Sequence, residues 1–92
     1  MITAIVFVQA ETARIPEVAE AIAALDGVSE VYSVTGQIDL IALVRVSSHD
    51  DIAAVVADRL NKVEGVVDTE THIAYRAYSR HDLEAAFSLG LD

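Results

Sequence analysis

The sequence predicts an α+β protein of the ferredoxin-like class, a βαββαβ sandwich formed by one domain over residues 1–92. Short apolar runs rich in β-branched residues alternate with longer segments whose apolar residues follow the i, i+3, i+4 spacing of a helix. The second half of the chain also repeats the first, since Asp26-Gly27-Val28 is matched by Glu64-Gly65-Val66. Two tandem units of strand, helix and strand give the predicted order of elements.

The first unit begins with a strand over Ile2–Val8 that is apolar on both faces. A helix should follow, starting near 13–15 because Pro16 is tolerated only in a first helical turn, and ending at Asp26-Gly27. Val28–Thr35 is then predicted as the second strand. The expected buried stripe of the helix consists of Ile15, Val18, Ala19, Ile22 and Leu25.

The second unit begins after a short turn with a strand over Leu40–Val46. Ser48 followed by Asp51 is typical of a helix start. That helix should run to Glu64-Gly65, and a long last strand should cover 66–78. A short C-terminal helix is expected over 80–89. The buried stripe of the second helix should consist of Ile52, Val55, Val56, Leu60 and Val63.

Both central strands of this sheet are apolar on both faces, although helices should cover only one face. Ala4, Val6 and Val8 alternate with Ile5 and Phe7, and the strand over 40–46 shows the same pattern. A chain of 92 residues has little left to cover the second face. We therefore expect a homodimer with its sheets paired face to face, forming part of a higher oligomer.

The composition excludes several classes of function. Fifteen acidic residues against six Lys and Arg give a net charge of −9, and the basic residues are scattered singly, which argues against direct nucleic-acid binding. The absence of cysteine removes disulfides and thiol chemistry. The sequence shows no signal-peptide pattern and no apolar run long enough for a membrane helix, so a cytoplasmic protein without membrane contact is expected.

No motif joins the titratable residues into a catalytic site, so the sequence does not predict an enzyme, a cofactor or a metal. The three histidines, His49, His72 and His81, lie in separate segments. His72 shares one strand face with Asp68 and Glu70, a weak metal-site pattern that also describes an ordinary polar strand.

The turn before residue 40, Gly36-Gln37-Ile38-Asp39, is the strongest candidate for a binding site. Glycine and aspartate are ordinary turn residues and need no functional explanation. The turn nevertheless offers unpaired backbone groups and one carboxylate. These groups suit a zwitterion, since Asp39 can accept hydrogen bonds from an ammonium group while backbone N–H groups donate to a carboxylate.

Three motifs in register resemble one known family. Val34–Leu40 resembles the TGxxD hairpin of the Lrp/AsnC effector-binding domain, also called the RAM domain. Gly65–Thr71 resembles the GVxxTxT motif of the same family, and Leu25–Val28 resembles its LPGV segment with Asp26 in place of proline. The resemblance covers essentially the whole chain.

This resemblance implies face-to-face dimers that assemble into rings, with an amino-acid effector bound between dimers. Carried over by position, the expected ligand-binding residues are Gly36, Gln37, Ile38, Asp39, Thr69 and Thr71. Relatives carry an N-terminal helix-turn-helix that this sequence lacks, so it resembles a stand-alone form. Such a domain would regulate transcription through a partner, a full-length Lrp/AsnC regulator being one candidate.

Other interpretations of the sequence remain open at this point. A small dimeric α/β-barrel enzyme, such as a monooxygenase or isomerase, shares the strand order and would need a convergent residue such as His72. A purely structural assembly module would use the hairpin only for contacts between dimers. An ACT domain shares the topology, but its ligand site favours a Gly-bearing loop after the first strand, and residues 8–14 contain no glycine.

Overall fold

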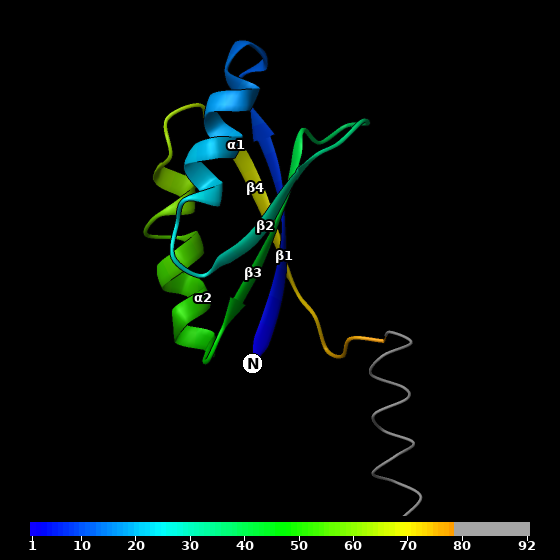
Figure 1. Ribbon diagram of the computed structural model, residues 1–92, viewed down its shortest axis with the longest axis vertical. Helices are drawn as coiled ribbons and strands as arrows, with labels where there is room; N and C mark the ends of the chain where they lie inside the picture. The colour runs from blue at the N-terminus through cyan, green and yellow to red at the C-terminus, as the bar shows by residue number, and fades with distance from the viewer. Residues whose placement is uncertain (79–92) are drawn as a thin grey trace, which may run out of the picture.

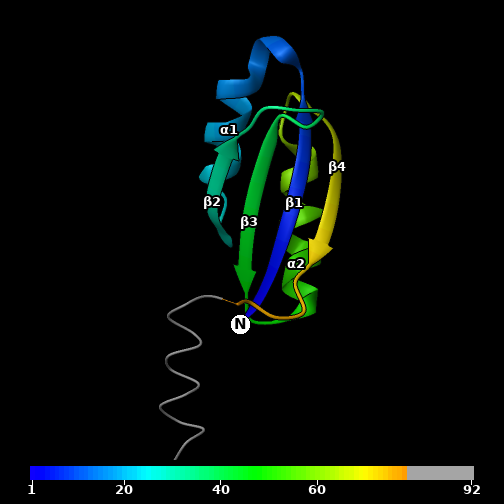
Figure 2. The same cartoon turned by 90° about the vertical axis from the view of Figure 1, so that its right-hand side faces the viewer.

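In the computed structural model, which describes residues 1–78, two helices cover one face of a four-stranded antiparallel sheet. The strand order is β2-β3-β1-β4, so the first and third strands lie in the middle as expected (Figures 1 and 2). This arrangement confirms the ferredoxin-like fold. The elements are β1 Ile2–Ala10, α1 Ile15–Ala23, β2 Val28–Ser33, β3 Leu40–Val46, α2 His49–Val56 and β4 Val66–Ile73, with 3-10 turns at Thr12–Arg14 and Leu60–Lys62.

Both helices begin where their local sequence predicts. Pro16 occupies the first turn of α1, where a missing N–H costs no helical hydrogen bond. Ser48 caps α2, its Oγ accepting a hydrogen bond from the Asp51 N–H at 3.3 Å. Val18 and Ile22 of α1 are fully buried against the sheet, which confirms the predicted stripe.

Several predicted boundaries differ from the structure by a few residues, and two, the end of the last strand and the end of the second helix, differ most. The last strand ends at Ile73 instead of continuing to 78, because its ladder partner β1 begins at Ile2 and the Ala74 N–H already donates to Thr3 O at 2.9 Å. The second helix ends at Val56, and Leu60 reaches the core from a 3-10 turn instead. The apolar residues between 52 and 63 keep the spacing of one buried helix. Periodicity alone therefore did not reveal that the helix ends after Val56. The predicted C-terminal helix over 80–89 lies outside the described residues.

The two faces of the sheet are both apolar but differ in burial. On the helix-covered face, six residues of the central strands are completely buried: Ala4, Val6, Val8, Leu40, Ala42 and Val44. On the opposite face, which we call the open face, Phe7 pairs with Ile41 and Ile5 pairs with Leu43. These four side chains remain partly exposed. Within residues 1–78, no helix is long and apolar enough to cross a membrane.

Candidate ligand-binding site

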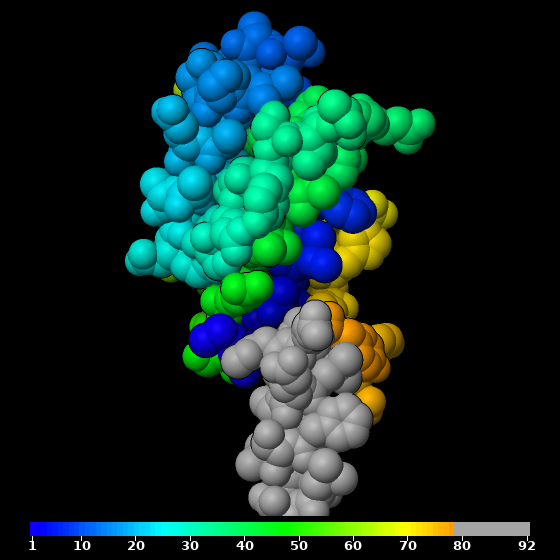
Figure 3. Space-filling view, turned by 45° about the vertical axis from the view of Figure 1, so that its right-hand side comes forward, coloured from blue at the N-terminus to red at the C-terminus, as the bar shows by residue number. Residues whose placement is uncertain are grey.

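The loop between β2 and β3 projects from the end of the sheet on the open-face side (Figures 1 and 3). Its base is closed by the Val34 N–H, which donates to Asp39 O at 3.0 Å. The Asp39 N–H in turn donates to Val8 O at 3.0 Å, which fixes the loop to β1. Gly36 lies at the tip with φ of +113°, a conformation that favours glycine. The sequence therefore builds a loop that is anchored at its base and exposed at its tip.

Asp39 also holds the loop through its side chain. Its Oδ2 accepts a hydrogen bond from the Ala10 N–H at 2.9 Å in a partly buried position. The register between β1 and β4 shifts between Gln9 and Ala10, so this contact lies at an irregularity of the ladder. Gln9 adds a second link, its Nε2 donating to Gln37 O at 3.4 Å. Asp39 thus has a structural role whether or not it contacts a ligand.

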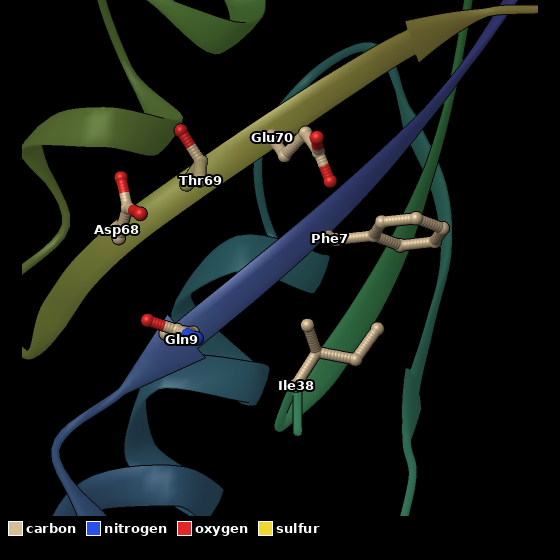
Figure 4. A pocket seen from close by; sticks show the side chains of 6 residues that line it. All are labelled: Phe7, Gln9, Ile38, Asp68, Thr69 and Glu70. Carbon is tan, nitrogen blue, oxygen red and sulfur yellow. The ribbon is translucent and has the colours of Figure 1, made fainter. Parts of the chain in front are cut away.

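Beside this loop, the open face carries a depression of about 350 Å³. Figure 4 shows the side chains that surround it, which come from β1, β4 and the last part of the loop. They are Phe7, Gln9, Ile38, Asp68, Thr69 and Glu70. Figure 3 shows the loop overhanging the surface formed by β1 and β4. We call this depression the hairpin pocket.

The structure brings together only part of the predicted set. Ile38 and Thr69 line the hairpin pocket, whereas Gly36 and Gln37 are exposed along the loop. Thr69 and Thr71 share one face, but it is the helix-covered side, because they pair with Val8 and Val6. Thr69 Oγ1 donates to Asn61 Oδ1 at 2.7 Å and Thr71 is exposed at the sheet edge. Both threonine side chains are thus directed to the helix-covered side, so Thr69 borders the hairpin pocket without turning its hydroxyl group toward the open face, and Thr71 does not border it.

Four lining residues were not predicted as ligand contacts: Phe7, Gln9, Asp68 and Glu70. They meet because β1 and β4 pair with Phe7 opposite Glu70 and with Gln9 opposite Asp68. Period-two alternation placed Phe7 on the open face, and the same alternation placed Asp68 and Glu70 together. The missing information was the register between the two strands, which no local pattern in the sequence specifies.

The charged side chains of the hairpin pocket, Asp68 and Glu70, are both acidic. His72 lies next in the same row, with Nε2 3.4 Å from Glu70 Oε2 and its ring centroid 5.1 Å from that of Phe7. In the part of the chain that the structure describes, these residues do not form a metal-binding group of three. The arrangement suits a cationic group, because two carboxylates border a depression whose other lining residues are partly apolar.

The loop provides complementary donors. Among residues 1–78, none of the backbone N–H groups of residues 35–38 donates to another protein group. Unpaired N–H groups of this kind bind carboxylates. Of these residues, Ile38 lines the hairpin pocket beside Asp68 and Glu70.

Comparison with known proteins shows the family. Residues 3–83 match the model of the Lrp/AsnC ligand binding domain. YugG, an uncharacterised HTH-type transcriptional regulator from Bacillus subtilis, is 39% identical over 66 residues, which is 72% of this chain and 39% of YugG. The chain thus spans about two fifths of the length of such curated relatives. Their names indicate transcriptional regulators rather than enzymes.

Solved structures agree with this assignment. TTHA0845 from Thermus thermophilus is 48% identical, with a TM-score of 0.81 over 87% of this chain and all of that chain. The transcriptional regulator NMB0573 from Neisseria meningitidis, solved as a complex with L-Met, has the same fold with a TM-score of 0.76. It is 18% identical, and the match covers 86% of this chain and 53% of that one. The chain described here belongs to the Lrp/AsnC ligand-binding domain family.

Proposed function

We propose that this domain is a regulatory module that binds an amino acid in the hairpin pocket. The observation that supports the proposal is that the end of the loop, which offers N–H donors, and the carboxylates of β4 lie at the same depression. Ile38 lines the depression and its N–H donates to no group of residues 1–78, so with the neighbouring loop N–H groups it can serve the α-carboxylate, while Asp68 and Glu70 can accept from an ammonium group. Phe7 and Ile38 supply apolar contacts for the aliphatic part of the side chain.

The charge of the pocket favours one class of amino acid. A neutral amino acid brings one ammonium group, whereas lysine or arginine brings a second cation for the second carboxylate. We therefore expect amino acids with basic side chains to bind more tightly than neutral ones of similar size. Acidic amino acids should bind least, because their side chains meet like charge.

The open face supports assembly as part of the same function. Ile5, Phe7, Ile41 and Leu43 form a continuous apolar strip on the two central strands, and the described part of the chain leaves them partly exposed. A second copy pairing sheet to sheet would remove this strip from water. We propose a homodimer built in this way, with dimers meeting near the projecting loops so that the effector lies between them.

Regulation would act through a partner. The relatives are HTH-type transcriptional regulators. Its net charge of −9 disfavours direct contact with DNA phosphates. We propose that effector binding changes how this domain assembles with a DNA-binding regulator of the same family. The expected cytoplasmic location stays a prediction.

Isothermal titration calorimetry of the chain with each of the twenty amino acids tests the proposal. We expect saturable binding that is strongest for lysine or arginine. Glu70→Gln should weaken that binding by about tenfold, the effect of losing one charge-assisted hydrogen bond. The matched control is Glu20→Gln, which neutralises an exposed carboxylate on the outer side of α1. Absence of binding for all twenty amino acids would contradict the proposal.

Asp39 needs a different substitution because it also holds the loop. Asp39→Asn keeps an oxygen for the Ala10 N–H but removes the charge. If Asp39 contacts the ammonium group, this variant stays folded, keeps its oligomer size and loses affinity. If the affinity for the amino acid is unchanged, Asp39 is only a structural residue. The ammonium group is then bound by the carboxylates of β4.

A further inference from the structure

The residues that follow β4, 74–78, lie on the open-face side of the sheet, and we call this segment the arm. The Ala74 N–H donates to Thr3 O at 2.9 Å, which ties the start of the arm to β1. The chain then bends to the helix-free side in Figure 1 and crosses the lower ends of β1 and β3 in Figure 2. The arm therefore lies at one end of the face that a second copy is proposed to cover.

Within the described residues, the arm is tied to its own chain at its start only. The bond from Ala74 is the one backbone hydrogen bond of the arm among residues 1–78. A depression of about 350 Å³ lies between the arm and the apolar residues Ile5 and Leu43 of the central strands. Tyr75 is 103% exposed and Tyr78 is 76% exposed. Two aromatic side chains thus stand in water beside an apolar sheet face.

The apolar strip alone is small for a stable contact between two copies. A stable interface buries about 800 Å² on each partner, of which about 60% is apolar, so each copy needs roughly 500 Å² of apolar surface. The four strip residues are already partly buried and together offer on the order of 250 Å². Tyr32, which pairs with Ile41 at the border of the strip and is 48% exposed, adds about 100 Å². A shortfall of roughly 150 Å² remains.

The tyrosines of the arm can supply this missing surface. An aromatic side chain buries about 150–250 Å² when it is covered, so Tyr75 and Tyr78 need to be covered only in part. Because the arm lies on the open-face side, a copy that pairs sheet to sheet meets the arm as well as the strip. Tyrosine also suits the border of such a contact, since its ring is apolar and its hydroxyl group can stay in water.

We propose that the arm forms part of the contact between two copies of this chain, with Tyr75 and Tyr78 of each copy packed against the open face of the other. This inference rests on the homodimer proposed above and names side chains that hold it together. In a twofold dimer each copy gives its arm and receives the arm of its partner, so the contact is made twice. The depression beneath the arm then lies inside the contact between the copies.

Sedimentation equilibrium of serine variants tests the contribution of the tyrosines. Tyr75→Ser and Tyr78→Ser should each raise the dimer dissociation constant by about tenfold or more, since each variant loses a covered ring on both copies. The control is Val67→Ser, because Val67 is 64% exposed and lies beside Asn61 at the start of β4, away from the arm. It should change the dissociation constant by less than about twofold. Circular dichroism should show the same fold in all three variants, because these side chains are exposed.

A spin label tests whether the arm contacts the partner copy. The chain contains no cysteine, so Ala77→Cys provides one attachment site within the arm and keeps both tyrosines. Spin-labelled chain is mixed with isotope-labelled parent chain, so only contacts between copies broaden the observed NMR resonances. We expect the strongest broadening at residues 5–7 and 40–43 of the open face and weaker broadening in α1 and α2. A label at Glu20→Cys, on the exposed side of α1, should spare the open face.

Two results would overturn the role of the arm and leave the homodimer standing. One is an unchanged dissociation constant when both tyrosines are replaced together, and the other is broadening by the Ala77→Cys label that misses the open face. A parent chain that sediments as a monomer would overturn the homodimer and the arm contact together. Amino-acid binding is measured separately by calorimetry, so the failure of one proposal is distinguishable from the failure of the other.

Discussion

Asp39 links the loop, the first strand and the candidate ligand through one side chain. Its Oδ2 is used by the Ala10 N–H, while its other carboxylate oxygen forms no hydrogen bond within residues 1–78. The sequence identified Asp39 as a turn residue and a candidate ligand contact. It could not predict Ala10 as the partner, because that contact spans 29 residues and depends on the packing of β1 beside the loop.

Gly65 is a residue whose substitution by alanine should cost much stability. It has φ of +98°, and a Cβ built there would lie 2.6 Å from Val18 Cγ2 of α1. Gly65→Ala should lower the free energy of unfolding by roughly 2 to 4 kcal/mol, from backbone strain together with overpacking. Urea denaturation measures the change.

Gly36 provides the matched control for that substitution. Its φ is also positive, but a Cβ there meets nothing within 4 Å among the described residues. Gly36→Ala should therefore cost only the backbone strain, about 1 to 2 kcal/mol. Equal losses in the two variants would show that the contact with α1 does not matter at Gly65.

At the scale of elements, local patterns predicted the strands and helix starts better than their ends. Ser48 and Pro16 act within their own helical turns, so their effects can be read from neighbouring residues. The end of β4 depends on where β1 begins, and the break after Val56 leaves the apolar spacing intact. Register between β1 and β4, which assembles the hairpin pocket, is likewise a property of two distant segments.

Helix α2 should depend measurably on its cap. Ser48→Ala removes the oxygen that accepts from the Asp51 N–H, and we expect a loss of about 1 kcal/mol in the free energy of unfolding. The neighbouring Ser47 is the control, because it is exposed and precedes the cap. Ser47→Ala should change the stability by less than about 0.5 kcal/mol. Equal effects at both positions would contradict the capping role.

For the whole molecule, the sheet with two apolar faces is the feature that its sequence predicted most directly. Six central-strand residues on the helix-covered face are completely buried, whereas the apolar residues of the open face are partly exposed. That difference could be expected from alternation along β1 and β3, because helices supply only one cover. The sequence contains no comparable pattern for the mutual orientation of two such sheets, because that orientation depends on contacts with a second copy of the chain.

A charge placed in the centre of the open face should separate the proposed dimer. Ile41 pairs with Phe7 on one side and with Tyr32 on the other, so its side chain lies in the middle of the strip. Ile41→Glu should convert the assembly to monomers that remain folded, as measured by analytical ultracentrifugation and circular dichroism. Ala21→Glu, on the exposed side of α1, should keep the oligomer of the parent chain. An unchanged oligomer in Ile41→Glu would place the assembly contact elsewhere.

The central claim is that an amino acid binds between the projecting loop and β4. A crystal structure of the chain grown with the tightest-binding amino acid tests it most directly. The account predicts the ligand in the hairpin pocket, its carboxylate on the N–H groups of residues 35–38 and its ammonium groups near Asp68 and Glu70. A ligand bound at another place, or loops of neighbouring copies that fill the pocket themselves, would contradict it.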